Sequence, residues 1–311
     1  MKLILVLAAA LLLISASGCT SQTPEVRERA YVQSVIISKE NETELTLLPF
    51  EDSGEPMSGK GTDVFAAKED AAIKTGLEIF LGHAELLCLS EPLDASELTE
   101  LLSEHRLSPA CRVLLLHETE INEDVSATSL TDSLRLEAEK GRIPETDLFT
   151  MLSELQGGDN TALAPVLTDK GFGMGITNGS ELLGVLSEKA VKGLVWLRGD
   201  KTPERISIQG EGSAESCEIY SSETILSAEI VKGIPHINVR IRISGSGNTD
   251  AGCQLIKAYC QTAIQETISD LRADVIGLDA CLAKDCPEYY AQQDFSTAKM
   301  AAVFELDVQE K

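Results

Sequence analysis

The amino-acid sequence predicts an α+β fold, and three patterns along the chain lead to that prediction. In the N-terminal half, short apolar runs at 84–90 and 110–116 flank an amphipathic helix at 96–105, which is the spacing of a parallel βαβ unit. In the C-terminal half, short alternating runs precede a long helix at 253–273, which indicates a mainly antiparallel sheet packed on that helix. Between these halves lies a glycine-rich stretch at 171–197 that opens the C-terminal domain.

The composition is that of a folded and strongly acidic protein. The chain has 311 residues, of which 43% are hydrophobic, so it can bury a sizeable core. Its 26 Lys and Arg residues against 50 Asp and Glu residues give a net charge of −24, which would repel nucleic acid and anionic lipid headgroups. Aromatic residues make up only 4%, which argues against stacking surfaces for bases. We therefore expect no nucleic-acid partner.

The N-terminus has the pattern of an export signal that ends in a lipid-attachment site. Lys2 is followed by an apolar run at 3–14, which is too short to span a membrane. The small residues at 16–18 stand directly before Cys19 and resemble the bacterial lipobox, in which the cysteine thiol takes a diacylglycerol before cleavage. We predict a signal peptide at 1–18 and lipidation of Cys19. The alternative is ordinary cleavage that leaves Cys19 as a free or bridged thiol.

Local patterns predict the remaining N-terminal elements. The β-rich runs at 30–38 and 43–50 indicate a hairpin, and apolar residues at helical spacing indicate a helix at 63–81. A further helix is predicted at 145–155, and it leads into an apolar strand at 162–167.

The stretch 171–197 contains three apolar runs. The runs at 172–176 and 182–186 are predicted strands joined at Asn178-Gly179, because Asn-Gly supplies the positive φ that tight turns need. After a short polar helix, the run at 193–197 is predicted to be a third strand, and it holds the only Trp of the chain. Further strands of the C-terminal domain are predicted at 205–208, 217–220, 223–231, 237–243 and 300–308.

The segment from Gly54 to Thr62 resembles a phosphate-binding loop, but the match fails at one position. Such a loop needs Ser or Thr directly after Gly59-Lys60 as a magnesium ligand, and Gly61 stands there instead. We predict a flexible loop in which Thr62 caps the following helix. The sequence therefore predicts no nucleotide and no other cofactor.

The eight cysteines of the sequence leave an odd seven if Cys19 is lipidated. Cys253 and Cys260 are about 10 Å apart along the predicted helix, too far for a disulfide, whereas Cys281 and Cys286 could close a small loop. The cysteines also lack the paired Cys-x-x-Cys spacing of zinc sites. We favour the interpretation that they are small buried thiols.

No motif in the sequence indicates catalysis. The four histidines are scattered, and neither HExxH nor GxSxG occurs. The segment from His117 to Glu120 could form one corner of a metal site, but the solvated end of a strand explains it as well. We predict no metal site and no enzymatic activity.

Short motifs in both halves of the chain follow one shared pattern. The segments Leu183-Gly184-Val185-Leu186 and Gly193-Leu194-Val195-Trp196-Leu197 correspond to an "lvG.L" strand and a "GL.WL" segment. Near the N-terminus, an opening "REI…A.V..I.ID" run is matched by Arg27-Glu28, Ala30, Val32 and Val35-Ile36-Ile37. In these motifs the chain resembles the Ger(x)C family of spore-germination lipoproteins, although Tyr289 or Tyr290 stands where that family usually has Trp. The chain is also shorter than typical relatives, mainly in its C-terminal domain.

The resemblance implies a domain plan and a role. After the signal peptide, an N-terminal domain at 19–169 and a C-terminal domain at 170–311 are expected. The resemblance implies the C subunit of a nutrient germinant receptor, lipid-anchored on the outer face of the spore inner membrane beside the membrane-embedded subunits A and B. A rival hypothesis is an extracytoplasmic solute-binding lipoprotein, which should show two similar lobes around a ligand cleft.

Overall fold

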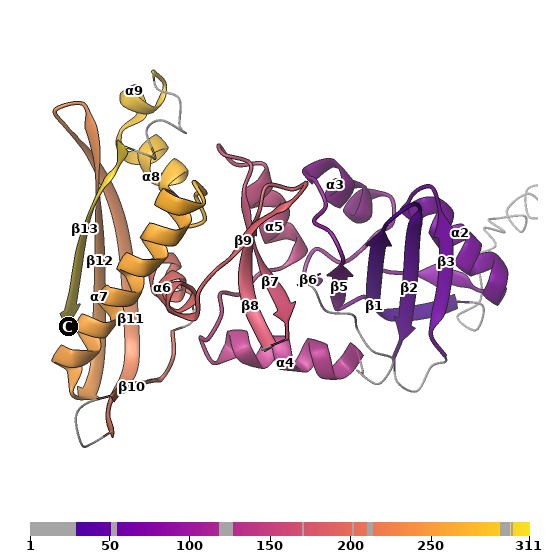
Figure 1. Ribbon diagram of the computed structural model, residues 1–311, viewed down its shortest axis with the longest axis horizontal. Coiled ribbons are helices and arrows are strands. Elements are labelled where there is room, and N and C mark those ends of the chain that lie inside the picture. Colours follow the sequence, from indigo (N-terminus) through magenta and orange to yellow (C-terminus); the bar gives the residue numbers. More distant parts are fainter. Residues whose placement is uncertain are drawn as a thin grey trace, which may run out of the picture.

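The computed structural model describes residues 29–50, 55–117, 127–169, 171–200, 202–209, 214–292, 299 and 301–311, which form an elongated molecule with a sheet toward each end (Figure 1). The N-terminal elements are β1 (Arg29–Lys39), β2 (Thr43–Pro49), β3 (Met57–Gly61), α2 (Val64–Thr75), β4 (Glu78–Phe80), β5 (Leu86–Leu89), α3 (Ala95–Ser103), β6 (Arg112–Leu116), α4 (Ala127–Glu139), α5 (Leu148–Leu155) and β7 (Ala162–Thr168). The later elements are β8 (Gly171–Thr177), β9 (Leu182–Val185), α6 (Glu188–Arg198), β10 (Arg205–Gln209), β11 (Ala214–Val231), β12 (Ile234–Gly247), α7 (Thr249–Ile264), the π-helix η2 (Gln265–Asp270), α8 (Leu278–Asp285), α9 (Pro287–Tyr290) and β13 (Val303–Glu310).

The first sheet confirms the predicted βαβ unit. Its strand order is β3-β2-β1-β5-β6-β7-β8-β9, with β4 pairing to the start of β1. Strands β5 and β6 are parallel, with Leu86 opposite Arg112, and α3 connects them. The predicted hairpins β1–β2 and β8–β9 are also present. The predicted domain boundary near Lys170 falls between β7 and β8, which pair antiparallel along their whole length, so the first sheet continues to Val185.

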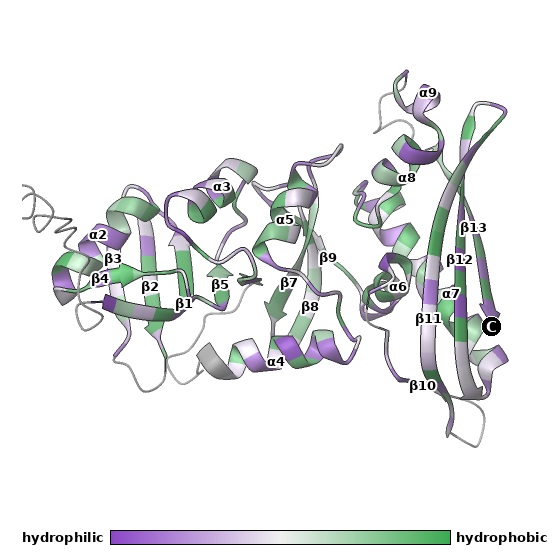
Figure 2. Cartoon of the chain, turned by 180° about the vertical axis from the view of Figure 1, so that it is seen from behind, coloured by the Kyte–Doolittle hydropathy of each residue, from purple (hydrophilic) through white to green (hydrophobic). Residues whose placement is uncertain are grey.

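Both faces of the first sheet are covered, which explains its continuous apolar strands. Leu87 and Leu89 pack with side chains of α2, α3 and α5, whereas Leu86 and Cys88 pack on the opposite face with side chains of α4. Strands that are buried on both faces are hydrophobic at consecutive positions rather than alternately. In Figure 2, β5 is green along its length, as expected for a strand buried on both faces. Helix α4, which covers only one face of the sheet, carries both colours.

The second sheet confirms the predicted C-terminal architecture. Strands β10, β11 and β12 are antiparallel, and β13 adds to β12 in parallel. The runs predicted at 217–220 and 223–231 belong to one strand, β11, which has a register irregularity between Ile219 and Ser221. Helix α7 packs on this sheet, and its Ile256 and Cys260 join the same core cluster as Ile241 of β12.

The predicted strand at 193–197 is wrong, because this run lies inside helix α6. Ser187 caps the helix by accepting a hydrogen bond from the Ala190 backbone N–H at 3.2 Å, and Gly199 ends it with a left-handed φ of 67°. From Gly193 to Leu197 every residue is buried, since α6 lies between α7 and the first sheet. A helix that is apolar all round has no helical periodicity, so a short apolar run of this kind looks like a buried strand.

The predicted flexible loop at 54–62 is also wrong where the structure describes it. Residues 57–61 form β3, which pairs antiparallel with β2. A Cβ atom on Gly59 would lie 2.0 Å from the Ala67 carbonyl oxygen of α2, so this glycine permits close contact between strand and helix. The cap of α2 is Asp63 rather than Thr62, because the Asp63 carboxylate accepts a hydrogen bond from the Ala66 N–H at 2.8 Å.

Several helix boundaries differ from the sequence prediction, most clearly those of α2 and α7. Helix α2 ends at Thr75, where Gly76 adopts a left-handed φ of 69°, and β4 follows within the range predicted as helix. Helix α4 was not predicted at all. Helix α7 begins at Thr249, four residues before the predicted start at Cys253, and continues as the π-helix from Gln265.

Candidate functional sites: a polar pocket and a buried ionic junction

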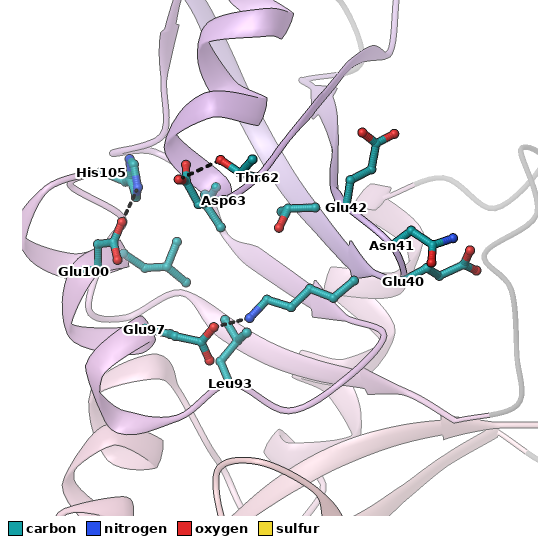
Figure 3. A pocket seen from close by; sticks show the side chains of 13 residues that line it. Glu40, Asn41, Glu42, Thr62, Asp63, Leu93, Glu97, Glu100 and His105 are labelled. Carbon is teal, nitrogen blue, oxygen red and sulfur yellow. Dashed lines mark hydrogen bonds and ion pairs between the residues drawn. The ribbon is translucent and has the colours of Figure 1, made fainter.

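The first candidate site is a pocket of about 300 Å³ in the N-terminal part (Figure 3). It lies beyond the carboxyl end of β1 and is bounded by the β1–β2 turn, the start of α2 and one side of α3. Its polar lining includes Lys39, Asp63, Glu97, Glu100 and His105. Carboxylates therefore outnumber cationic groups in this pocket.

Two of the lining carboxylates are already engaged. Glu97 forms an ion pair with the Lys39 ammonium, and its other oxygen accepts the Asp94 backbone N–H at 3.0 Å in the capping box of α3. Asp63 caps α2, and the hydrogen bond from the Ala66 N–H holds the pKa of Asp63 below its usual value. These contacts fix the pocket wall and neutralise the charge of Lys39.

His105 is the unusual group of the pocket. Its side chain is only 1% exposed, and its Nε2 atom has no hydrogen-bond partner among the described residues. The Glu100 carboxylate lies 3.6 Å from Nε2, which is close enough for Coulombic attraction but beyond hydrogen-bonding distance. Burial lowers the pKa of His105 below 6.5, and the nearby Lys68 lowers it further, so the imidazole is neutral at neutral pH.

The second candidate site is a buried ionic junction where α5, α6 and the segment before α8 meet. Arg198 Nη1 lies 2.8 Å from Glu154 Oε1 and donates a hydrogen bond to the Val275 carbonyl oxygen at 2.8 Å. Its Nε donates to Asp200 at 3.3 Å. Burial raises the pKa of Glu154 and of Asp200, while the attraction of Arg198 opposes the rise. Burial alone would lower the pKa of Arg198, but the two carboxylates outweigh it and raise the pKa.

The junction continues at Asp159, which follows α5. Lys299 Nζ lies 2.7 Å from the Asp159 carboxylate, and the two side chains are only 3% and 7% exposed. The same carboxylate accepts the Asp274 backbone N–H at 2.5 Å. The Asp274 carboxylate in turn accepts four backbone N–H groups at 276–279, where α8 begins. Burial raises the pKa of Asp274, although these backbone hydrogen bonds oppose the rise. The junction therefore joins four segments that are distant along the chain through ion pairs and hydrogen bonds.

Of the residues singled out from the sequence, Thr62 lines the polar pocket, whereas the others named here lie apart from both sites. Cys19 lies outside the described residues, as do Glu118, Thr119 and Glu120 of the suggested metal corner. Lys60 lies on β3, with its ammonium 3.1 Å from Glu44 on β2. Across the described ranges, no group of three His, Cys, Asp or Glu residues could hold a metal ion.

The seven cysteines of the described segments are free thiols. Burial raises the pKa of Cys88 and of Cys260 to about 12, so both thiols stay protonated at neutral pH. In the part of the chain that the structure describes, no helix has the length and hydropathy needed to cross a bilayer.

Sequence reasoning missed both sites because their members are far apart along the chain. Arg198 and Asp200 lie at the end of α6 and just after it, and neither they nor Glu154 and Lys299 belong to a motif that indicates a buried ion pair. Asp159 and Lys299 are 140 positions apart, and they meet only through the tertiary fold.

Comparisons with known proteins give one consistent result over most of the chain. Residues 22–169 match the family model for the spore germination protein N-terminal domain, and residues 172–309 match the model for the spore germination B3/GerAC-like C-terminal domain. No curated protein matches the chain. The crystal structure of the GerBC protein shares the fold, with a TM-score of 0.58 and 14% identity over 91% of this chain and 97% of that chain. The chain therefore belongs to the GerAC family of spore germination proteins, as its resemblance to the Ger(x)C family predicted.

Proposed function

We propose that this chain is the C subunit of a nutrient germinant receptor in spores. The observation that carries the proposal is the match of both family models, in order, over residues 22–169 and 172–309. The fold shared with the GerBC protein supports the same assignment. In this proposal, lipid on Cys19 holds the protein on the outer face of the spore inner membrane, and its partners are the membrane-embedded subunits A and B.

The proposed subunit acts through its surfaces rather than through a reaction. The buried charged groups of the junction are paired with one another, as in the Arg198–Glu154 and Lys299–Asp159 pairs. Such pairs hold a shape and leave no activated nucleophile. The elongated body, with a sheet toward each end, offers separate surfaces to partners (Figure 1).

Deletion of the gene in the source organism tests the role in germination. Spores without the chain should fail to germinate with the nutrient that its receptor senses, yet respond to triggers that bypass nutrient receptors. A wild-type copy should restore the response. A Lys60→Ala copy should restore it equally, because Lys60 contacts only exposed carboxylates of β2 and the neighbouring turn. Normal germination of the deletion strain with every nutrient, in the absence of a paralogue, would refute the proposal.

Co-purification tests the partners. A tagged chain extracted from spore membranes in mild detergent should bring down the A and B subunits in fixed proportion. Recovery of the chain alone, from spores whose nutrient response depends on it, would contradict the proposed contacts but not the role in germination.

A further inference from the structure

The pocket beside α3 has the electrostatic character of a cation site. Five carboxylates line it, from Glu40, Glu42, Asp63, Glu97 and Glu100. Its one permanent cation, Lys39, is paired with Glu97 and so contributes little free positive charge. A recess lined mainly by one sign of charge concentrates ions of the opposite sign.

One edge of the pocket holds two polar groups that lack a shared partner. His105 Nε2 is buried without a hydrogen bond among the described residues, and the Glu100 carboxylate stands 3.6 Å away. Buried polar atoms in folded proteins nearly always have a hydrogen-bond partner. A neutral imidazole accepts a hydrogen bond at Nε2 when its proton sits on Nδ1, and a carboxylate only accepts. A group with two N–H donors, placed beside both atoms, would satisfy them together.

The remaining walls limit the size and character of an occupant. Val64, Leu93 and Leu101 supply apolar surface next to the carboxylates. The volume of about 300 Å³ is at the lower end of the range for small-molecule sites. The pocket also lies at the carboxyl end of the parallel strands β1 and β5, where open sheets commonly bind ligands. A metal ion fits poorly, because no three ligating residues converge anywhere in the described ranges.

We propose that this pocket binds a small organic cation, a primary ammonium group on a short apolar body, with the ammonium between Glu100 and His105. The ammonium donates hydrogen bonds to the Glu100 carboxylate and to His105 Nε2, and the apolar body lies against Val64, Leu93 and Leu101. The inference does not depend on the proposed role in germination, since binding is measured on the purified chain.

Isothermal titration calorimetry of the full chain at constant ionic strength and pH 7.5 tests this site with three probes of the same carbon skeleton. The probes are n-butylammonium chloride, butan-1-ol and sodium butyrate, which are cationic, neutral and anionic. We expect saturable one-site binding of the ammonium probe only. Glu100→Gln should weaken this binding by about tenfold or more, since it removes a charge-assisted hydrogen bond at a position that is partly exposed and tolerant of change.

The matched control is Glu104→Gln, which removes the same charge one turn later from an exposed residue outside the pocket lining. This variant should bind the ammonium probe within about twofold of the wild-type chain. Equal binding of butan-1-ol, equal losses in the two variants, or heats that never saturate would each overturn the proposal.

Discussion

Arg198 is the residue on which the junction depends most. Replacing it with Met removes the cation from the partly buried Glu154 and Asp200 carboxylates, whose side chains are 18% and 27% exposed. We expect the free energy of unfolding to fall by about 3 kcal/mol, because an ion pair shielded from water leaves an uncompensated charge when one partner is removed. Urea denaturation measures this change.

Arg135→Met is the matched control for this prediction. Arg135 also contacts two carboxylates, Asp132 at 3.0 Å and Glu139 at 3.3 Å, but it is 50% exposed. Water screens exposed ion pairs, so the control should lose much less stability than Arg198→Met does. Similar losses in the two variants would show that burial of the junction is not what stabilises it.

His105 predicts a dependence of stability on pH. Its pKa in the folded chain is lowered, first by burial and then by Lys68 on α2, while Glu100 and Glu104 act in the opposite direction. The unfolded chain therefore binds more protons than the folded chain as the pH falls through 6.5, and the folded state loses stability in that window. We expect the free energy of unfolding to decrease from pH 7 to pH 5, and His105→Gln to flatten that decrease. An unchanged pH profile in the variant would contradict the prediction.

At the scale of elements, the contact between α6 and α7 depends on one glycine. A Cβ atom on Gly193 would lie 2.1 Å from the Tyr259 carbonyl oxygen of α7. We expect Gly193→Ala to lower the free energy of unfolding by about 2 kcal/mol, because the steric cost exceeds the gain of about 1 kcal/mol in helix propensity. Thermal and urea unfolding measure the change.

Gly173→Ala in β8 serves as the control for the α6–α7 contact. The nearest atom to a Cβ there is a side-chain methyl of Val185 at 3.8 Å, which is ordinary contact. This variant should be neutral or gain up to about 1 kcal/mol, since alanine restricts the unfolded chain. Destabilisation of the same size in both variants would contradict the steric explanation.

The sequence was informative where an element has its own local signal. The Asn178-Gly179 turn, the strand–helix–strand spacing at 84–116 and the period-2 runs of the second sheet all led to elements that the structure confirms. It was misleading where burial removes periodicity, as in α6, and where glycines serve a contact with a distant helix, as at Gly59. Neither cause is visible in a local window of residues.

The candidate sites were less predictable than the fold for the same reason. Lys39 and His105 line one pocket although 66 positions separate them, and Lys299 contacts Asp159 across a separation of 140 positions. Local spacing predicts helices and strands, because those depend on neighbours in sequence. It does not predict which charged side chains the fold will bury together.

At the scale of the whole molecule, Cys19 should decide where the protein resides. If this residue carries lipid, Cys19→Ala should move the chain from the detergent-extracted membrane fraction to the soluble fraction. The reason is that stable attachment to the bilayer depends on the buried acyl chains, which the variant lacks. Fractionation and immunoblotting measure the shift, with Cys286→Ala as a control that keeps Cys19. Retention of the Cys19 variant in membranes washed at high salt would contradict the lipid anchor.

If the chain is anchored through Cys19, the elongated arrangement of the two sheets determines how far each sheet lies from the membrane. Cys19 and Arg29 are ten residues apart, a tether of at most about 35 Å when fully extended. The first strand belongs to the sheet toward one end of the molecule, and β13 belongs to the sheet at the other (Figure 1). With α6 and the Arg198 junction joining the two parts, the body would act as a stiff spacer. A short connection to the lipid and a stiff body together would fix the distance between the bilayer and the sheet that contains β13.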